Sequence, residues 1–260
     1  MTLRWEPLGP ARGRVVLLHG EMSHAATWWR MGPALAERGW SVLALDLPGH
    51  GVRPRVNHPL HLPELVQGVA SRLPGTIDLL VGHGLGAVVA AALASRYLDL
   101  TDAVVLEEPL SGRFEDRDRL AQQIAADSAL VHSGRERLAE RLRAANPRWL
   151  PDDVDHAVAG VAAADVPALL AGLRAARAWD LPTMVRTLRA AVLVLTAPEQ
   201  ADPHHGSATT LRGVDRLMLE RKLPADRFAV LDGGHYLHRD VPEAWLKSVT
   251  EFADVVYPPT

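Results

Sequence analysis

Short runs of β-branched and leucine residues alternate along the chain with longer amphipathic segments. These runs are Val15–Leu18, Val42–Leu45, Ile77–Val81, Ala103–Leu106, Ala191–Leu195 and Phe228–Leu231. Most are apolar along their whole length, which is typical of strands buried on both faces of a sheet. Helical periodicity is found between the runs, at Met31–Arg38, Leu85–Tyr97 and Pro242–Phe252. The alternation predicts an α/β fold with a doubly wound, mostly parallel sheet.

One segment, residues 113–188, breaks this alternation because it contains no convincing strand. Its amphipathic stretches, rich in Ala, Leu and Arg, are Phe114–His132, Arg135–Ala145, Pro151–Ala163 and Pro167–Trp179. Proline and glycine positions between them are typical of helix boundaries. A helical block inserted between two core strands usually covers the sheet as a lid. We therefore expect a core of residues 1–112 and 189–260 and a helical lid of residues 113–188.

Composition restricts the partners and the chemistry. The 260 residues carry 28 Lys and Arg against 31 Asp and Glu, a net charge of -3. This balance argues against a nucleic-acid or membrane-surface binder, so we expect a small-molecule substrate, no nucleic acid and no membrane. The absence of cysteine excludes a disulfide, a thiolate nucleophile and a Cys-ligated metal. The first residues lack the apolar core of a signal peptide, and no apolar run is long enough to cross a bilayer, which favours a cytoplasmic location.

A glycine-rich turn follows the third apolar run. Gly82, His83, Gly84, Leu85 and Gly86 connect a predicted strand to a predicted helix, which is the setting of the G-x-S-x-G nucleophile elbow. The middle residue of such an elbow points its side chain into the pocket from a strained backbone with positive φ. Here that residue is Gly84, which accepts the turn but has no oxygen that could attack a substrate.

Four landmarks resemble the α/β-hydrolase superfamily, in particular its lidded members with an HG oxyanion motif. In chain order they are His19-Gly20 with the pair Trp28-Trp29, the run Asp46 to Gly51, the elbow, and Gly233-Gly234-His235. They span nearly the whole chain. The resemblance implies that His235 is the catalytic base, and that the backbone N–H groups of Glu21 and Leu85 form an oxyanion hole. His19, Trp28 and Trp29 are candidates for substrate contacts, although the tryptophans are also suited to the core.

Glu21 is unusual, because a carboxylate beside an oxyanion hole repels the charge that the hole stabilises unless it is protonated or turned away. Two interpretations are open. Glu21 acts as a general acid or base, or it faces solvent or an arginine of the lid.

The carboxylate partner of His235 is open between three residues. Relatives usually place an aspartate after the strand at Val192–Leu195. Strict spacing puts Gln200 at this position, whereas a two-residue insertion would let Asp202 serve, and Glu199 is also near. Glu108 follows the strand that ends at Leu106, and some proteins with this fold place the acid there. We favour Asp202 over Glu108 and Glu199. Any of them would orient the imidazole and stabilise its charged form.

Three classes of function compete. The first is non-hydrolytic acid/base chemistry on a small carbonyl-containing molecule (elimination, cyclisation, isomerisation, C–C cleavage or cofactor-free oxygenation), using His235, its carboxylate and the oxyanion hole. The second is hydrolysis, either by a water that His235 activates in the space left by Gly84, or in a serine hydrolase whose serine has been exchanged for glycine. The third is a non-catalytic binding module. We expect no cofactor and no metal, because the spacing of His204-His205, His235 and His238 matches no zinc signature. The sequence does not indicate an oligomeric state.

Overall fold

A seven-stranded sheet forms the centre of the molecule. The computed structural model describes residues 1–174, 179–199 and 208–258. The strands are β1 (Thr2–Trp5), β2 (Gly13–Leu18), β3 (Trp40–Leu45), β4 (Leu79–His83), β5 (Ala103–Glu107), β6 (Ala191–Thr196) and β7 (Phe228–Val230), in the spatial order β1-β3-β2-β4-β5-β6-β7. β1 pairs antiparallel with β3, and all other pairs are parallel. The predicted α/β fold is therefore confirmed. The strand β1 was missed because its residues alternate between exposed and half-buried positions and form no apolar run.

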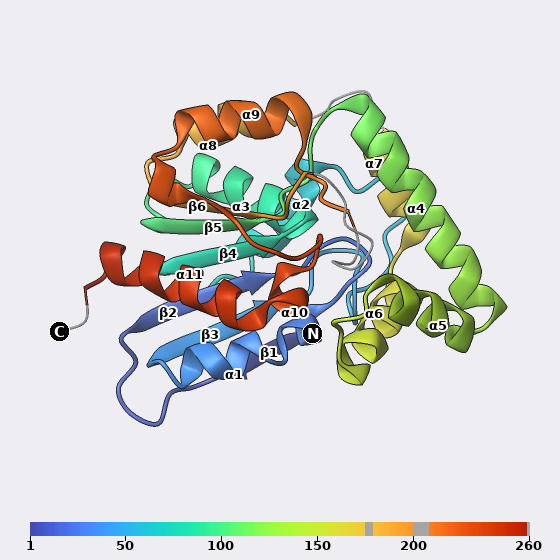
Figure 1. Ribbon diagram of the computed structural model, residues 1–260, viewed down its shortest axis with the longest axis horizontal. Coiled ribbons are helices and arrows are strands. Elements are labelled where there is room, and N and C mark those ends of the chain that lie inside the picture. The colour runs from blue at the N-terminus through green and yellow to red at the C-terminus, as the bar shows by residue number, and fades with distance from the viewer. Residues whose placement is uncertain (175–178, 200–207, 259–260) are drawn as a thin grey trace.

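Helices cover both faces of this sheet (Figure 1). The helices in the part of the chain that the structure describes are α1 (Met31–Ala36), α2 (Leu62–Ala70), α3 (Leu85–Arg96), α4 (Phe114–Ser133), α5 (Arg135–Ala145), α6 (Pro151–Ala163), α7 (Val166–Arg174), α8 (Leu181–Thr187), α9 (Gly213–Lys222), α10 (Leu237–Asp240) and α11 (Pro242–Val256), with short 3₁₀ turns η1 (Ala25–Trp28) and η3 (Ala225–Arg227). Helices α2, α3, α8 and α9 lie on one face, and α1 and α11 lie on the other.

Adjacent residues of each central strand point to opposite faces of the sheet and pack into two separate apolar layers. Leu80 and Val104 belong to the layer under α2 and α3, whereas Leu79 and Val105 belong to the layer under α1 and α11. All four side chains are fully buried. A strand that is buried on both faces has no solvent-exposed position that would favour a polar residue. The central strands therefore appear in the sequence as continuous apolar runs.

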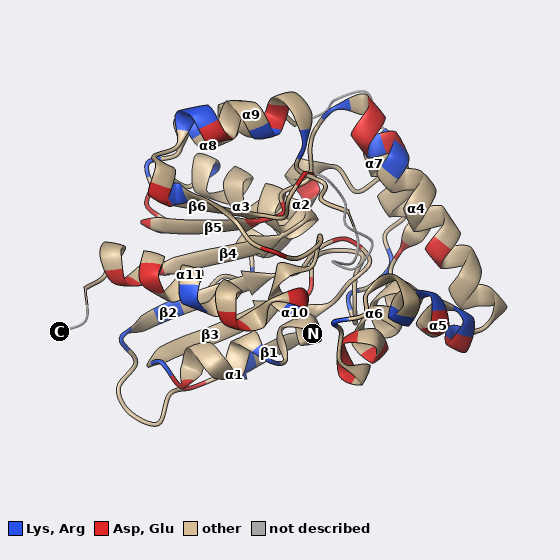
Figure 2. Cartoon of the chain, viewed as in Figure 1, with Lys and Arg blue, Asp and Glu red and all other residues tan. Residues whose placement is uncertain are grey.

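Helices α4 to α7 lie together beyond one end of the sheet, at the right of Figure 1. In the part of the chain that the structure describes, only helices lie between β5 and β6. Helix α8 falls inside the range predicted for the lid, yet it packs against α3 and α9. The exact limits of the lid stay a prediction. Most charged residues lie on the helices and loops rather than on the strands (Figure 2).

No single helix in the described ranges has both the length and the apolar character needed to cross a membrane. Helices α6 and α7 have the required length and apolar composition only when they are taken together, and this pair is bent by 80° at its break.

The turn between β4 and α3 brings backbone segments unusually close together. A β-carbon added to Gly82 would lie 2.3 Å from the carbonyl oxygen of Gly86, and one added to Gly86 would lie 2.4 Å from the carbonyl oxygens of Leu18 and His19. Both neighbours are backbone atoms, which cannot rotate away as a side chain can. Between them, Gly84 has a φ of +53°, in the left-handed region that favours glycine. These contacts fix the elbow against the end of β2.

The first prediction concerns Gly86→Ala. Helix propensity alone favours alanine at this position of α3 by about 1 kcal/mol. The backbone contacts outweigh this gain, and overpacking of this kind costs about 1–3 kcal/mol, so we expect the free energy of unfolding to fall. Urea denaturation measures the change. Gly9→Ala is the matched control, because a β-carbon there meets nothing within 4 Å; an unchanged or increased stability of Gly86→Ala would contradict the steric account.

Candidate active site

The candidate residues meet where several parallel strands end. Glu21 follows β2, Gly84 follows β4, and Glu108 follows β5. His235 lies in the loop between β7 and α10. Because the carboxyl ends of parallel strands lie at the same edge of a sheet, residues far apart in the sequence come together there. The site is therefore a product of the sheet topology.

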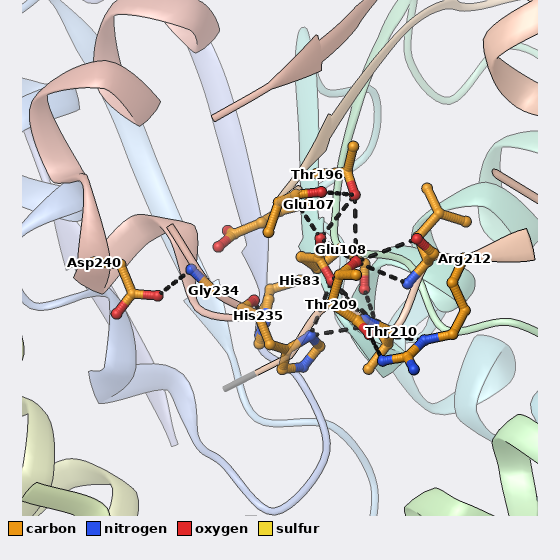
Figure 3. Close-up of polar contacts among 12 residues, drawn as sticks. His83, Glu107, Glu108, Thr196, Thr209, Thr210, Arg212, Gly234, His235 and Asp240 are labelled. Atoms are coloured by element: carbon orange, nitrogen blue, oxygen red, sulfur yellow. Dashed lines mark hydrogen bonds and ion pairs between the residues drawn. The ribbon is translucent and has the colours of Figure 1, made fainter. Parts of the chain in front are cut away.

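Two consecutive glutamates at the end of β5 point in different directions. Glu107 accepts hydrogen bonds from the backbone N–H of His238, from its Nδ1 (2.7 Å) and from Nε1 of Trp245 (2.9 Å), all on the α10–α11 side. Glu108 has a φ of +45°, which is rare for a residue with a β-carbon. Its side chain reaches the loop after β6 and His235 instead (Figure 3).

The carboxylate of Glu108 is fully buried and held by several donors. Thr196 and Thr209 each donate a hydroxyl at 2.8 Å to Oε1, and the backbone N–H of Ala197 donates to the same oxygen at 2.7 Å. The backbone N–H of Thr210 donates to Oε2 at 2.8 Å. A carboxylate that accepts this many hydrogen bonds is stabilised in its charged form and held in one orientation.

The imidazole of His235 lies between two buried carboxylates. Its Nδ1 is 3.4 Å from Oε2 of Glu108 and 3.3 Å from the hydroxyl oxygen of Thr210. Its Nε2 is 3.3 Å from Oε1 of Glu21, an ion-pair distance without the alignment of a hydrogen bond. The N–H of Gly234 donates to Asp240, and His83 Nε2 contacts the carbonyl oxygen of His235 at 2.9 Å, so both sides of this loop are anchored.

Glu21 points its carboxylate into the elbow. Oε2 of Glu21 accepts a hydrogen bond from the backbone N–H of Leu85 at 3.1 Å, which is one of the two predicted oxyanion-hole donors. A β-carbon on Gly84 would lie 2.6 Å from the same oxygen. The space beside Gly84 is therefore filled by the carboxylate of Glu21. It is not left open for a water, as one of the hydrolytic alternatives assumed.

The two carboxylates change the charge state of the imidazole. Burial lowers the pKa of His235, but Glu108 and Glu21 raise it further than burial lowers it, to about 10. Burial raises the pKa of Glu21, but its contacts with His235 and with backbone N–H lower it to about 2. The pKa of Glu108 is lowered in the same way by His235 and its backbone donors. At neutral pH the site holds a protonated imidazole between two ionised carboxylates.

A cavity of about 370 Å³ opens onto this group. Glu21, His235 and Tyr236 line it from the core side, and Arg119, Asp127 and Arg141 line it from α4 and α5. Arg141 forms an ion pair with Asp127. The cavity is therefore enclosed partly by the helices that the sequence predicts as a lid, and it is large enough for a small organic molecule.

Among the other predicted residues, those that the structure describes lie outside this group. Asp202 lies outside the described residues, and the side chain of Glu199 is exposed and accepts a hydrogen bond from the N–H of Gly213. Trp28 is buried in the core beside Trp245, and Trp29 donates to Asp153 of α6. His19 is fully buried and accepts the N–H of Leu47 at 3.0 Å. Neither tryptophan nor His19 is among the described residues that line the cavity.

Sequence reasoning missed the residues that hold Glu108 and line the cavity. Thr196 and Thr209 carry no motif, and their hydroxyls matter only because the chain folds back beside β5. Arg141 and Tyr236 line the cavity without any signal in the sequence that distinguishes them from other residues of their type. Only the position of Tyr236 directly after the predicted base could have drawn attention to it.

A second cluster, His83, Glu107 and His238, has the composition of a metal site, and its candidate ligand atoms lie within 4.8 Å of one another. All three are buried. Both carboxylate oxygens of Glu107, Nδ1 of His238 and Nε2 of His83 are already used in hydrogen bonds. The donor set is therefore arranged as a structural hydrogen-bond network, and it does not fit a metal ion without breaking these contacts.

Comparison with known proteins agrees with this architecture. The sequence pattern of the Alpha/beta hydrolase family matches residues 15–247. A serine hydrolase-like protein of Danio rerio is 30% identical over 166 residues, which cover 56% of this chain and 50% of that protein. The sn-1-specific diacylglycerol lipase ABHD11 of Mus musculus is 24% identical over 254 residues, 92% of this chain and 80% of the mouse protein.

Among solved structures, E-2-(acetamidomethylene)succinate hydrolase is similar, with a TM-score of 0.72 and 21% identity over 97% of this chain and 94% of that one. This likeness concerns the fold. Several relatives in sequence are matched over only part of their length, and the aligned region spans about half of the Danio rerio protein.

The second prediction concerns the partner of His235. Glu108→Gln removes a negative charge beside Nδ1, so we expect the pKa of His235 to fall below its value of about 10. Nitrogen-15 NMR of the imidazole measures the pKa directly. Glu199→Gln, which changes an exposed carboxylate, should leave it unaltered; an unchanged pKa in Glu108→Gln would remove the support for this pairing.

The third prediction concerns stability as a function of pH. The pKa of His235 is higher in the folded protein, about 10, than the usual 6.5, so protonation stabilises the fold. This contribution is fully present below pH 6.5 and is lost as the pH rises to 10. The difference in unfolding free energy between the wild type and His235→Asn should therefore shrink across that window. Chemical denaturation at several pH values measures it, and a difference that grows with pH would contradict the charged state.

Proposed function

We propose, from the premise that the chain belongs to the Alpha/beta hydrolase family, that it is an enzyme that works without the serine nucleophile. In this proposal His235 exchanges protons with a small carbonyl-containing molecule, and Glu108 orients and charges the imidazole. The reaction is of the non-hydrolytic acid/base type, such as isomerisation, elimination or C–C cleavage.

One observation carries this proposal: the imidazole of His235 lies between two buried carboxylates at the wall of a cavity, while Gly84 has no side chain to act as a nucleophile. Burying three ionisable groups together costs free energy unless they are paired. The fold supplies those pairs and the hydroxyl and N–H donors around Glu108. Strongly shifted pKa values in a cavity are a frequent property of acid/base sites.

Hydrolysis is the second candidate, because the family and the similar proteins named above include hydrolases and a lipase. A water attacking a bound ester would have to approach from the cavity, since Glu21 fills the space beside Gly84. If the chain is a serine hydrolase with serine exchanged for glycine, the carboxylate of Glu21 has to move when the serine is present, because a β-carbon at position 84 would lie 2.6 Å from its oxygen.

The fourth prediction tests the proposed class of reaction. Small ketones, keto acids and esters that bind are first selected by saturation-transfer NMR. Proton NMR in D₂O then records whether the protein exchanges the hydrogens beside the carbonyl group or cleaves the ester. We expect exchange catalysed by the wild type and a loss of at least about 100-fold in His235→Asn, since proton transfer by a positioned side chain contributes about 10²–10⁴-fold.

Glu243→Gln, on the exposed side of α11, is the control for a general effect of substitution. Ester cleavage without exchange would favour the hydrolytic candidate. Binding with neither reaction, in both the wild type and His235→Asn, would leave the binding module as the better description.

A further inference from the structure

The carboxylate of Glu21 occupies the place where the elbow of this fold would present a reactive side chain. Oε2 lies 2.6 Å from the position that a β-carbon of residue 84 would take, and it accepts the N–H of Leu85. Oε1 lies 3.3 Å from Nε2 of His235. Glu21 is 7% exposed and lines the cavity, so the carboxylate has access to a bound molecule without facing bulk water.

We propose that Glu21 is a catalytic residue that takes a proton from the carbon beside a substrate carbonyl group, while protonated His235 donates to the carbonyl oxygen. This inference rests on the proposed acid/base function and assigns its two roles. The substrate class is a small carbonyl compound with a hydrogen on the adjacent carbon. In this arrangement a side chain at residue 84 would displace the carboxylate, because its β-carbon would lie 2.6 Å from Oε2.

The geometry suits this division of roles. A carbonyl oxygen and the hydrogen-bearing carbon next to it are separated by only one carbon atom, so two neighbouring groups can act on them together. Nε2 of His235 is buried and has no aligned hydrogen bond, although Oε1 of Glu21 is close. Its N–H is therefore available to a substrate oxygen. Leu85 holds the other oxygen of Glu21, which leaves Oε1 as the oxygen that can accept a proton.

The step balances without any further reactant. The C–H bond of the substrate breaks and its proton goes to Oε1 of Glu21. The electron pair of that bond forms a carbon–carbon double bond, and the carbonyl π electrons move to oxygen, which takes the proton from Nε2 of His235. The products are a neutral enol, a protonated Glu21 and a neutral imidazole. Returning the protons to different atoms gives isomerisation. In elimination, the enol O–H proton returns to Nε2 of His235, the carbonyl group re-forms, and a leaving group on the next carbon departs with its electron pair and takes the proton from Glu21.

The same step also removes the reason for the low basicity of Glu21. Burial raises the pKa of this carboxyl, whereas the positive charge on His235 lowers it to about 2. When His235 gives its proton to the carbonyl oxygen, this charge disappears and the basicity of Glu21 rises. The two transfers therefore assist each other, as expected for strongly coupled titrating groups.

This assignment replaces the role expected for the backbone donors. With Glu21 in place, the N–H of Leu85 binds a carboxylate of the protein and is not free to stabilise an oxyanion of the substrate. The developing charge on the carbonyl oxygen is neutralised by the imidazolium instead. Protonated His235, which lies 3.4 Å from Glu108, thus stabilises the charge on the carbonyl oxygen, as the oxyanion hole does in a serine hydrolase.

The fifth prediction uses the D₂O exchange measurement with the carbonyl compounds that bind the wild type. We expect Glu21→Gln, which keeps the shape but cannot accept a proton, to reduce exchange by about 100-fold or more. Binding of the same compounds, measured by saturation transfer, should be retained. Glu21→Asp, which restores a shorter carboxylate, should recover part of the rate, and Glu243→Gln should match the wild type.

The outcomes separate this inference from the proposed function. Exchange that survives in Glu21→Gln but is lost in His235→Asn would overturn the role of Glu21 and leave the proposed function standing. Compounds that bind the wild type and carry a hydrogen beside the carbonyl, yet never exchange it, would overturn both.

A second measurement tests whether the carboxylate of Glu21 and a side chain at residue 84 exclude each other from the same space. Gly84→Ser alone crowds the carboxylate, so we expect slower proton exchange and no labelling by a fluorophosphonate probe, because Glu21 still occupies the Leu85 N–H. Gly84→Ser combined with Glu21→Ala frees both the space and the donor, and should be labelled at the hydroxyl introduced at position 84. Wild-type exchange rates in Gly84→Ser, or equal labelling of the single and double variants, would contradict the inference. Circular dichroism confirms that each variant is folded.

Discussion

The burial of two carboxylates against one imidazole is the constraint on which the rest of this site depends. Glu21, Glu108 and His235 are each at most 7% exposed, and an unpaired charge at such a depth would be strongly unfavourable. The imidazolium offsets one of the two negative charges, and the second requires fixed donors. The hydroxyls of Thr196 and Thr209 and the backbone N–H of Ala197 supply them.

The strands of the sheet position the carboxylates and the donors that stabilise them. The donors for Glu108 come from the end of β6 and the residues near Thr209, and Glu108 reaches them from a backbone with positive φ at the end of β5. Glu21 reaches the elbow because Gly86 lets α3 approach the end of β2. The parallel register of β2, β4, β5 and β6 thus positions the charged groups as directly as it positions the apolar core.

The sequence predicted the parts of the fold that depend on local pattern. The apolar runs located the strands after β1, and proline, glycine and asparagine marked the limits of α5 and α6 to the residue. His235 was identified as a candidate from the motif Gly233-Gly234-His235, and the structure places its imidazole at the cavity.

What the sequence could not decide depends on three-dimensional approach. The choice among carboxylates favoured Asp202, which lies outside the described residues, whereas Glu108 is the acid found beside His235. Nothing near Glu108 in the sequence reveals the threonines that hold it, since they lie 88 and 101 positions away. The direction of the Glu21 side chain was also open, because it depends on the absence of a β-carbon at residue 84.

The close fit between Gly84 and Glu21 also means that these two positions cannot be varied independently. A β-carbon at residue 84 would lie 2.6 Å from Oε2 of Glu21, so a side chain at this position requires the carboxylate to move. The conformation of Glu21 is thus coupled to the identity of residue 84, so the changes in the free energy of unfolding caused by substitutions at these two positions are not expected to add.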